Sequence, residues 1–160
     1  KYNSTTRKTM EIAGALMEKG VNAAKIIDDS FFAKTYGQAK LHGRAVLDSV
    51  RILDNRCVYT VVTTDELREY GCTVKATDGI VDQLRIIEGI EIAFLLYQTG
   101  NPDEYKVSLR TNSAVDVSRI AQSFGGGGHV KAAGCTMTGE PQEIVEKISG
   151  KIREQWEELK

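Results

Sequence analysis

The sequence predicts an α/β domain with a mixed sheet of about four or five strands flanked by helices. Runs rich in β-branched and aromatic residues alternate with amphipathic stretches at helical spacing, which is typical of α/β proteins. A turn signal, Asn101-Pro102-Asp103, separates two of these runs and predicts an antiparallel hairpin. The sheet is therefore expected to be mixed. A helical segment and a connector helix are expected before it.

The N-terminal residues are predicted to form three helices. The first is expected to end before Gly20 and to start at one of three N-cap candidates, Ser4, Thr5 and Thr6. A second helix follows the N-cap candidate Asn22. A third spans residues 35–53, and the charges opposite its apolar stripe suggest a connector between two lobes. The predicted organisation is a helical tail (1–34), a connector helix (35–54) and an α/β domain (55–160).

Four segments of the α/β domain have the composition of strands: residues 57–62, 90–97, 105–110 and a short stretch near 135–137. The turn signal Asp54-Asn55 precedes the first of them. Helices between and after the strands are expected to begin at Thr63 or Thr64, at Thr77-Asp78, at Ser113 or Asp116, and at Pro141. Alternation along the third strand sends its apolar residues to one face and Lys106, Ser108 and Arg110 to the other.

Composition limits the classes of function. The chain has 160 residues and a net charge of −1, so a broad basic surface for nucleic acid is excluded and any phosphate recognition must be local. Cys57, Cys72 and Cys135 lack zinc spacing and predict free thiols in a reducing compartment. No apolar run approaches the ~18 residues of a spanning helix, so we expect a cytoplasmic protein without membrane contact. Because the sequence starts at Lys1 rather than methionine, we expect a longer parent polypeptide.

The stretch at residues 125–134, GGGGHVKAAG, is the strongest candidate for a binding site. Consecutive glycines allow backbone N–H groups to converge on an anion, and an imidazole and an ammonium stand beside them. The candidate residues are Gly125, Gly126, Gly127, Gly128, His129, Lys131, Ala132, Ala133 and Gly134. A flexible linker is the alternative interpretation. The stretch is neither a Walker loop nor a dinucleotide fingerprint, because it lacks the GK[ST] ending and no strand runs directly into it.

Arg110 is a second candidate, because a guanidinium at the end of the hairpin strand could face the same pocket as His129. The alternatives are a solvated strand end for Arg110 and a structural role for His129. His42 is expected on the surface of the connector helix. No residue pattern indicates a catalytic apparatus or a metal site, so the chain is interpreted as a binding lobe.

Two segments, SLRTN (108–112) and FGGGGHVKAAG (124–134), resemble the C-terminal, DHH-associated substrate-binding domain of DHH phosphoesterases. The signature of that family is a glycine run, a histidine, two variable residues, two alanines and a glycine, which matches residues 126–134. The stretch TDGIVDQL, the strand IEIAFLLY and the opening YNSTTRKT are also similar to the family. Within it, the chain most resembles bacterial oligoribonucleases that also dephosphorylate adenosine 3′,5′-bisphosphate.

The resemblance implies a two-lobed parent enzyme. Its N-terminal DHH catalytic domain would bind two manganese ions and hydrolyse the phosphodiester, and residues 1–34 would be its helical tail. The chain would bind short RNA or nucleotide substrate through Arg110 and the glycine–histidine stretch, would hold no cofactor and would be inactive alone. A homodimer is a further expectation. Alternatives are the lobe of a cyclic dinucleotide phosphodiesterase, a non-catalytic RNA-binding or dimerisation module like that of alanyl-tRNA synthetases, and an ordinary structural domain.

Overall fold

A computed structural model describes residues 5–160, and the chain divides into two units, Lys1–Thr35 and Tyr36–Lys160. Of the N-cap candidates, Ser4 lies outside the described residues. Thr6 caps the first helix, because its hydroxyl accepts from the Thr9 N–H and the Thr9 hydroxyl accepts from the Thr6 N–H.

The first unit consists of short helices without a core of their own. It contains α1 (Arg7–Glu18), α2 (Ala23–Ile27) and the π-helical turn η2 (Asp28–Phe32). None of its described residues is buried, and its large apolar side chains, including Met10, Leu16 and Phe32, are exposed. Isolated helices of this length are marginal in water, because most helical stability in proteins comes from packing an apolar face.

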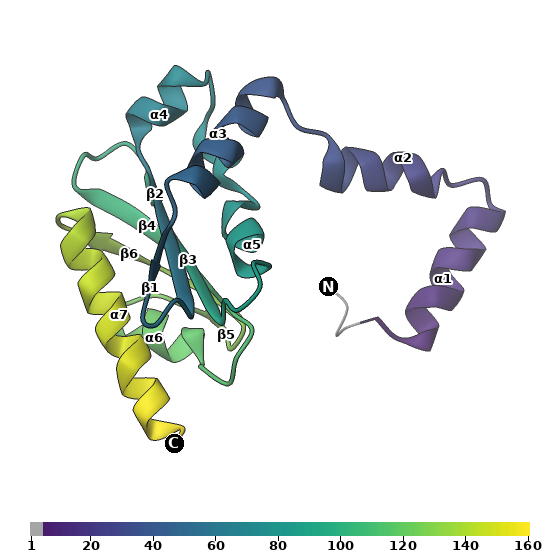
Figure 1. Ribbon diagram of the computed structural model, residues 1–160. Coiled ribbons are helices and arrows are strands. Elements are labelled where there is room, and N and C mark those ends of the chain that lie inside the picture. The colour runs from purple at the N-terminus through teal and green to yellow at the C-terminus, as the bar shows by residue number, and fades with distance from the viewer. Residues whose placement is uncertain (1–4) are drawn as a thin grey trace. The chain divides into compact units, whose positions relative to one another are not determined.

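The second unit is built on a mixed sheet of six strands in the order β1-β2-β3-β4-β6-β5 (Figure 1). The strands are β1 (Val50–Ile52), β2 (Cys57–Val62), β3 (Ile92–Gln98), β4 (Glu104–Thr111), β5 (Gly127–His129) and β6 (Ala132–Thr138). Only β2 and β3 pair in parallel, and the other four pairs are antiparallel. The predicted mixed sheet is confirmed, with slightly more strands than expected.

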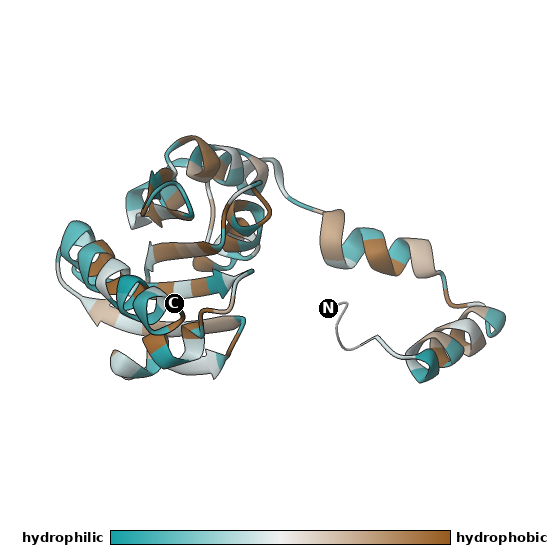
Figure 2. Ribbon diagram, turned by 60° about the horizontal axis from the view of Figure 1, so that its bottom comes forward, coloured by the Kyte–Doolittle hydropathy of each residue, from teal (hydrophilic) through white to brown (hydrophobic). Residues whose placement is uncertain are grey.

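Helices cover the two faces of this sheet unequally. On one face, α6 (Val117–Ser123) and α7 (Pro141–Glu158) cover a core that includes Phe94, Leu109 and Ile148 (Figure 1). Apolar and polar residues alternate along the α7 ribbon, as expected for a helix that buries one side and exposes the other (Figure 2). On the other face, α3 (Tyr36–Leu47), α4 (Thr64–Glu69), the 3₁₀ turn η3 (Val74–Thr77) and α5 (Ile80–Arg85) enclose a second core over β2 and β3.

The two additional strands come from segments that the sequence analysis assigned otherwise. The predicted helix over residues 35–53 is wrong beyond Leu47, where the chain turns into β1 and pairs with β2. The turn between these strands passes through Leu53, Asp54 and Asn55, which all have positive φ angles, so the Asp54-Asn55 turn is confirmed. The predicted glycine loop contains β5, which pairs with β6. Contacts place α3 and β1 in the same unit as the rest of the sheet.

Most other predicted boundaries are confirmed within a few residues. Thr63 caps α4 in a capping box with Glu66, and Asp116 caps α6 through bonds to the N–H groups of Ser118 and Arg119. The hydrogen bond from the Ser118 hydroxyl is the largest cause of the lowered pKa of Asp116. The predicted cap at Thr77-Asp78 is wrong by one residue, because Gly79, with φ 90°, precedes α5. Within residues 5–160, no helix is both long and apolar enough to cross a membrane.

Replacing Leu41 by alanine is expected to lower the free energy of unfolding by about 2–5 kcal/mol, because it leaves a cavity in the core between α3 and the sheet. Leu47→Ala on the same helix is the matched control, since Leu41 is 1 % exposed and Leu47 is 81 % exposed. Urea denaturation measures both. Equal effects of the two substitutions would contradict the packing of α3 on the sheet.

Candidate phosphate-binding site

The helices leave part of one sheet face accessible. Over β2 and β3 this face is buried, at Val58, Val62, Ala93 and Leu95. Farther along the same face, over β4, β6 and β5, the side chains are partly or fully exposed. These accessible residues, here called the open face, are Lys106, Ser108, Arg110, Gly127, His129, Ala132, Gly134 and Thr136. Five of the ten residues that the sequence analysis selected lie on the open face, namely Arg110, Gly127, His129, Ala132 and Gly134. The expectation that Ala133 belongs to the site is wrong for its side chain, which is buried in the core on the opposite face.

Strand register places Arg110 and His129 in one row across the open face. Arg110 pairs with Ala132, and Ala132 also pairs with His129. Directly opposed residues of antiparallel strands point to the same side of a sheet, so all three share this face. The outer two lie two strand spacings apart, about 10 Å at the backbone. Because Ala132 has only a methyl group, little side-chain volume separates Arg110 from His129 on this face.

The first two glycines of the run end helix α6 and do not form a free anion nest. The Gly125 N–H donates to the Gln122 carbonyl at 3.0 Å, and the Gly126 N–H donates to the Ala121 carbonyl at 2.8 Å. This is the Schellman arrangement, which requires a left-handed residue after the helix, and Gly125 supplies it with φ 75°. The expectation that all four backbone N–H groups converge on an anion is therefore wrong for these two.

Gly126 and Gly128 are required by close packing against β6. A Cβ atom on Gly126 would lie 2.2 Å from the Gly134 carbonyl oxygen, and one on Gly128 would lie 2.6 Å from the Ala132 carbonyl oxygen. Gly127 differs, because a Cβ there would meet nothing within 4 Å. The glycine run thus allows the short edge strand β5 and the residue before it to pack closely against β6, and it leaves backbone without side chains on the open face. It does not behave as a linker.

Arg110 is held in place beside α5. Its Nε lies 3.5 Å from Asp82 Oδ1, its Nη1 donates to the Leu109 carbonyl at 3.0 Å, and its side chain is 27 % exposed. Asp82 Oδ1 also lies 3.4 Å from Nε of Arg85, whose Nη1 donates to Asn112 Oδ1 at 3.0 Å. The Asn112 amide in turn donates to the Arg85 carbonyl at 2.7 Å. This cluster orients the guanidinium while leaving part of it accessible to a ligand.

The two remaining polar candidates lie at the hairpin between β5 and β6. His129 is exposed, and no residue among those described forms a hydrogen bond with its ring. Lys131 lies in the turn, where its ammonium donates to the Ser113 carbonyl. The structure thus brings His129 into the row with Arg110 but directs Lys131 to the loop after β4. Lys131 tethers that loop, together with the bond from the Thr111 N–H to the Lys131 carbonyl at 3.2 Å.

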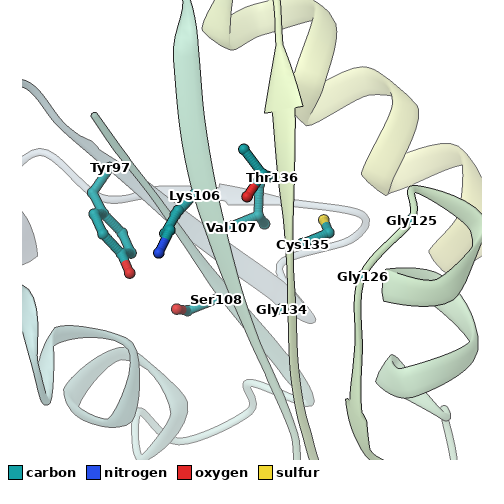
Figure 3. A pocket seen from close by; sticks show the side chains of 9 residues that line it. All are labelled: Tyr97, Lys106, Val107, Ser108, Gly125, Gly126, Gly134, Cys135 and Thr136. Carbon is teal, nitrogen blue, oxygen red and sulfur yellow. The ribbon is translucent and has the colours of Figure 1, made fainter. Parts of the chain in front are cut away.

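A hollow of about 370 Å³ continues the open face beyond this row and is lined by Tyr97, Lys106, Val107, Ser108, Gly125, Gly126, Gly134, Cys135 and Thr136 (Figure 3). Burial is the largest cause of the raised pKa of Tyr97, and the nearby carboxylate of Asp78 acts in the same direction. Burial also raises the pKa of Cys135 to about 11, so its thiol is protonated at neutral pH and is not a nucleophile.

Sequence reasoning missed several of these residues. Lys106 and Ser108 were assigned to the face of Arg110 but were not selected, and that alternation was the available signal. Tyr97 carried no such signal, because its place depends on the pairing of β3 with β4. The expected surface position of His42 is wrong. The residue is 3 % exposed, and its Nε2 lies 2.9 Å from the Ala76 carbonyl oxygen, which joins α3 to η3.

The described residues do not assemble a metal centre. Within residues 5–160, no three histidine, cysteine, aspartate or glutamate side chains lie close enough together to hold a metal ion. The groups that the open face does offer, a guanidinium, an imidazole and bare backbone, are those that bind phosphate.

The fold and the open face define an α/β domain with one partly accessible sheet face, and comparison with known families specifies its class. The chain belongs to the DHHA1 domain family, whose model matches residues 54–157. A DHHA1 domain normally accompanies an N-terminal DHH catalytic domain in its parent protein. The resemblance to the DHH phosphoesterases, predicted from the glycine–histidine motif, is confirmed.

Among individual proteins, the chain is 28 % identical over 156 residues to the bifunctional oligoribonuclease and PAP phosphatase NrnA of Thermus thermophilus, covering 97 % of this chain and 46 % of that protein. It is 55 % identical over 40 residues to the oligoribonuclease NrnB of Bacillus subtilis, covering 24 % of this chain and 10 % of that protein. The chain spans less than half the length of these curated relatives.

Solved structures share the fold. An exopolyphosphatase-related protein of Bacteroides fragilis matches with a TM-score of 0.86 at 22 % identity, over 95 % of this chain and 44 % of that one. A pGpG-specific phosphodiesterase of Vibrio cholerae matches with a TM-score of 0.51 at 16 % identity, over 73 % of this chain and 39 % of that one. At these identities, the similarity concerns the architecture alone.

The glycine contacts give a paired prediction. Gly126→Ala is expected to lower the free energy of unfolding by about 1–3 kcal/mol, because the new methyl group clashes with the backbone of β6. Gly127→Ala is the control and should change stability by less than about 1 kcal/mol, since its methyl group enters open space. Thermal and urea unfolding test both. A Gly127→Ala variant as unstable as Gly126→Ala would refute the packing explanation.

Proposed function

We propose that this chain is the substrate-binding lobe of a DHH phosphoesterase that hydrolyses short oligoribonucleotides and adenosine 3′,5′-bisphosphate. The observation that carries the proposal is the row of Arg110, Ala132 and His129 on the open face of a DHHA1 domain. The similarity to an oligoribonuclease and PAP phosphatase over nearly the whole chain supports this choice of substrate class.

In this proposal, Arg110 binds a phosphate group of the substrate. A guanidinium matches the geometry of phosphate and forms paired, charge-assisted hydrogen bonds. Asp82 restricts its orientation, so less side-chain entropy is lost when the ligand binds. His129 approaches the same phosphate from β5. Ala132 and Gly134 keep the intervening strand thin enough for the ligand to lie close to the sheet.

The hydrolytic step is assigned to an N-terminal DHH domain of the parent protein. Two manganese ions bound there would activate water and stabilise the displacement at phosphorus. The described residues of this chain do not fit these ions, because they provide no cluster of ligands. The chain's own residues bind and orient the substrate. The exposed apolar side chains of α1, α2 and η2 support a neighbouring domain, because packing them would stabilise these helices.

Arg110→Ala and His129→Ala are each expected to weaken binding of adenosine 3′,5′-bisphosphate by about 10- to 100-fold. This range follows from about 1.5–3 kcal/mol for a charge-assisted hydrogen bond and ~1.4 kcal/mol per tenfold change in affinity. The double variant should lose less than the sum, because both groups contact one phosphate. Isothermal titration calorimetry on the 160-residue chain measures the affinities.

Arg51→Ala is the matched control, because Arg51 is an exposed arginine on β1, at the opposite edge of the sheet. It should bind the nucleotide like the unaltered chain. Thermal unfolding of each variant checks that the fold is retained. Unchanged affinity in both single variants, with the fold intact, would overturn the proposed phosphate site.

A further inference from the structure

The open face extends past the Arg110–His129 row along the strands. Ser108, two residues before Arg110 on β4, lies opposite Gly134 on β6, and Gly134 lies opposite Gly127 on β5. Two residues farther, Lys106 lies opposite Thr136 on β6 and opposite Tyr97 on β3. These two rows border the hollow, where Tyr97, Lys106 and Ser108 point to the same side of the sheet (Figure 3). The hollow is thus continuous with the proposed phosphate site.

Lys106 supplies a second positive charge on the open face, in addition to that of Arg110. Its side chain is exposed, and its ammonium forms no ion pair or hydrogen bond with any residue in the described part of the chain. Lys106 lies four residues from Arg110 on β4, which corresponds to about 13 Å at the rise of a strand. The charge of a nucleoside 5′-monophosphate is confined to one end of the molecule. A ligand that reaches both cations therefore needs a second, separated phosphate.

The other groups of the hollow suit a nucleoside better than a bare phosphate chain. Tyr97 offers an aromatic ring, and aromatic rings stack on bases of any sequence. Ser108 and Thr136 add hydroxyl groups, and the glycines leave space for a planar ring. The nearby Asp78 carboxylate helps to raise the pKa of Tyr97, and it would repel a phosphate placed at that side of the hollow. The phosphate is then expected at Lys106 and the base at Tyr97.

We propose that the hollow formed by Tyr97, Lys106, Ser108 and Thr136 is a second nucleotide subsite, which receives the unit next to the one bound at Arg110 and His129. This inference rests on the proposed function and makes the domain selective for oligonucleotides over nucleoside 5′-monophosphates. Lys106 binds the second phosphate of the chain, and Tyr97 stacks on the second base.

The test compares three ligands by calorimetry on the whole chain: adenosine 5′-monophosphate, 5′-phosphorylated triadenylate and inorganic tripolyphosphate. Lys106→Ala is expected to weaken triadenylate binding about tenfold and to leave the monophosphate unchanged, since only the longer ligand reaches Lys106. The slope of log affinity against log salt should decrease by about 0.7 for triadenylate. Lys106→Arg should retain affinity. Lys147→Ala is the control, because Lys147 is exposed on α7, which covers the opposite face.

A second pair of variants tests whether the hollow binds a base through Tyr97. Tyr97→Leu is expected to weaken triadenylate binding at least about fivefold, whereas Tyr97→Phe retains the ring and should bind normally. Neither should affect tripolyphosphate, which has no base. If Lys106→Ala weakens tripolyphosphate as much as triadenylate and Tyr97→Leu changes neither, the hollow is a polyphosphate site and the nucleotide subsite is refuted.

The remaining outcomes separate this inference from the proposed function. If Arg110→Ala weakens all nucleotides while Lys106→Ala leaves triadenylate binding unchanged, the second subsite is wrong and the first stands. An equal loss of monophosphate and triadenylate affinity in Lys106→Ala would place the first nucleotide in the hollow and would also refute the second subsite. If the unaltered chain binds none of the nucleotides, both proposals fail.

Discussion

The structure depends on β4, which pairs with β3 on one side and with β6 on the other. Because side chains alternate along a strand, β4 contributes to the core and to the candidate site at once. Val107 and Leu109 pack under α6 and α7, while Lys106, Ser108 and Arg110 point to the open face. The register with β6 and β5 then aligns Arg110 with His129. A shift of one residue in this register would exchange the two sets and destroy both the core and the site.

The glycine run satisfies two demands within four residues. Gly125 and Gly126 end α6, and Gly126 and Gly128 allow the chain to cross close over β6, where a Cβ atom would collide with backbone. These are demands of folding. The absence of side chains also leaves the open face bare around Gly127 and Gly134, which is what a phosphate or a sugar–phosphate backbone needs. One motif therefore combines a structural role with the proposed binding role.

Charge is concentrated where the proposed ligand would bind. With a net charge of −1, the chain has little long-range attraction for nucleic acid, yet Lys106, Arg110 and His129 share one accessible face. Asp82 on α5 forms an ion pair with Arg110. Asp78, which lies just before α5, helps to raise the pKa of Tyr97. This pattern favours a short ligand with few phosphates over a long duplex, because counterion release grows with the number of neutralised phosphates. It is consistent with membership of the DHHA1 family.

The sequence by itself determined the α/β class, the strands β2, β3 and β4, and the glycine–histidine motif, because these depend on local periodicity and backbone preference. It limited two helix caps to Thr63 or Thr64 and to Ser113 or Asp116, and the structure selected Thr63 and Asp116. Tertiary structure decided what depends on distant partners. Val50–Ile52 became a strand because β2 offered an edge, and His42 was buried because Ala76 lies against it. The pairing of Ala132 with both Arg110 and His129, and the place of Tyr97 beside Lys106, arise from strand register. Register joins residues far apart in the chain, so local patterns alone do not fix it.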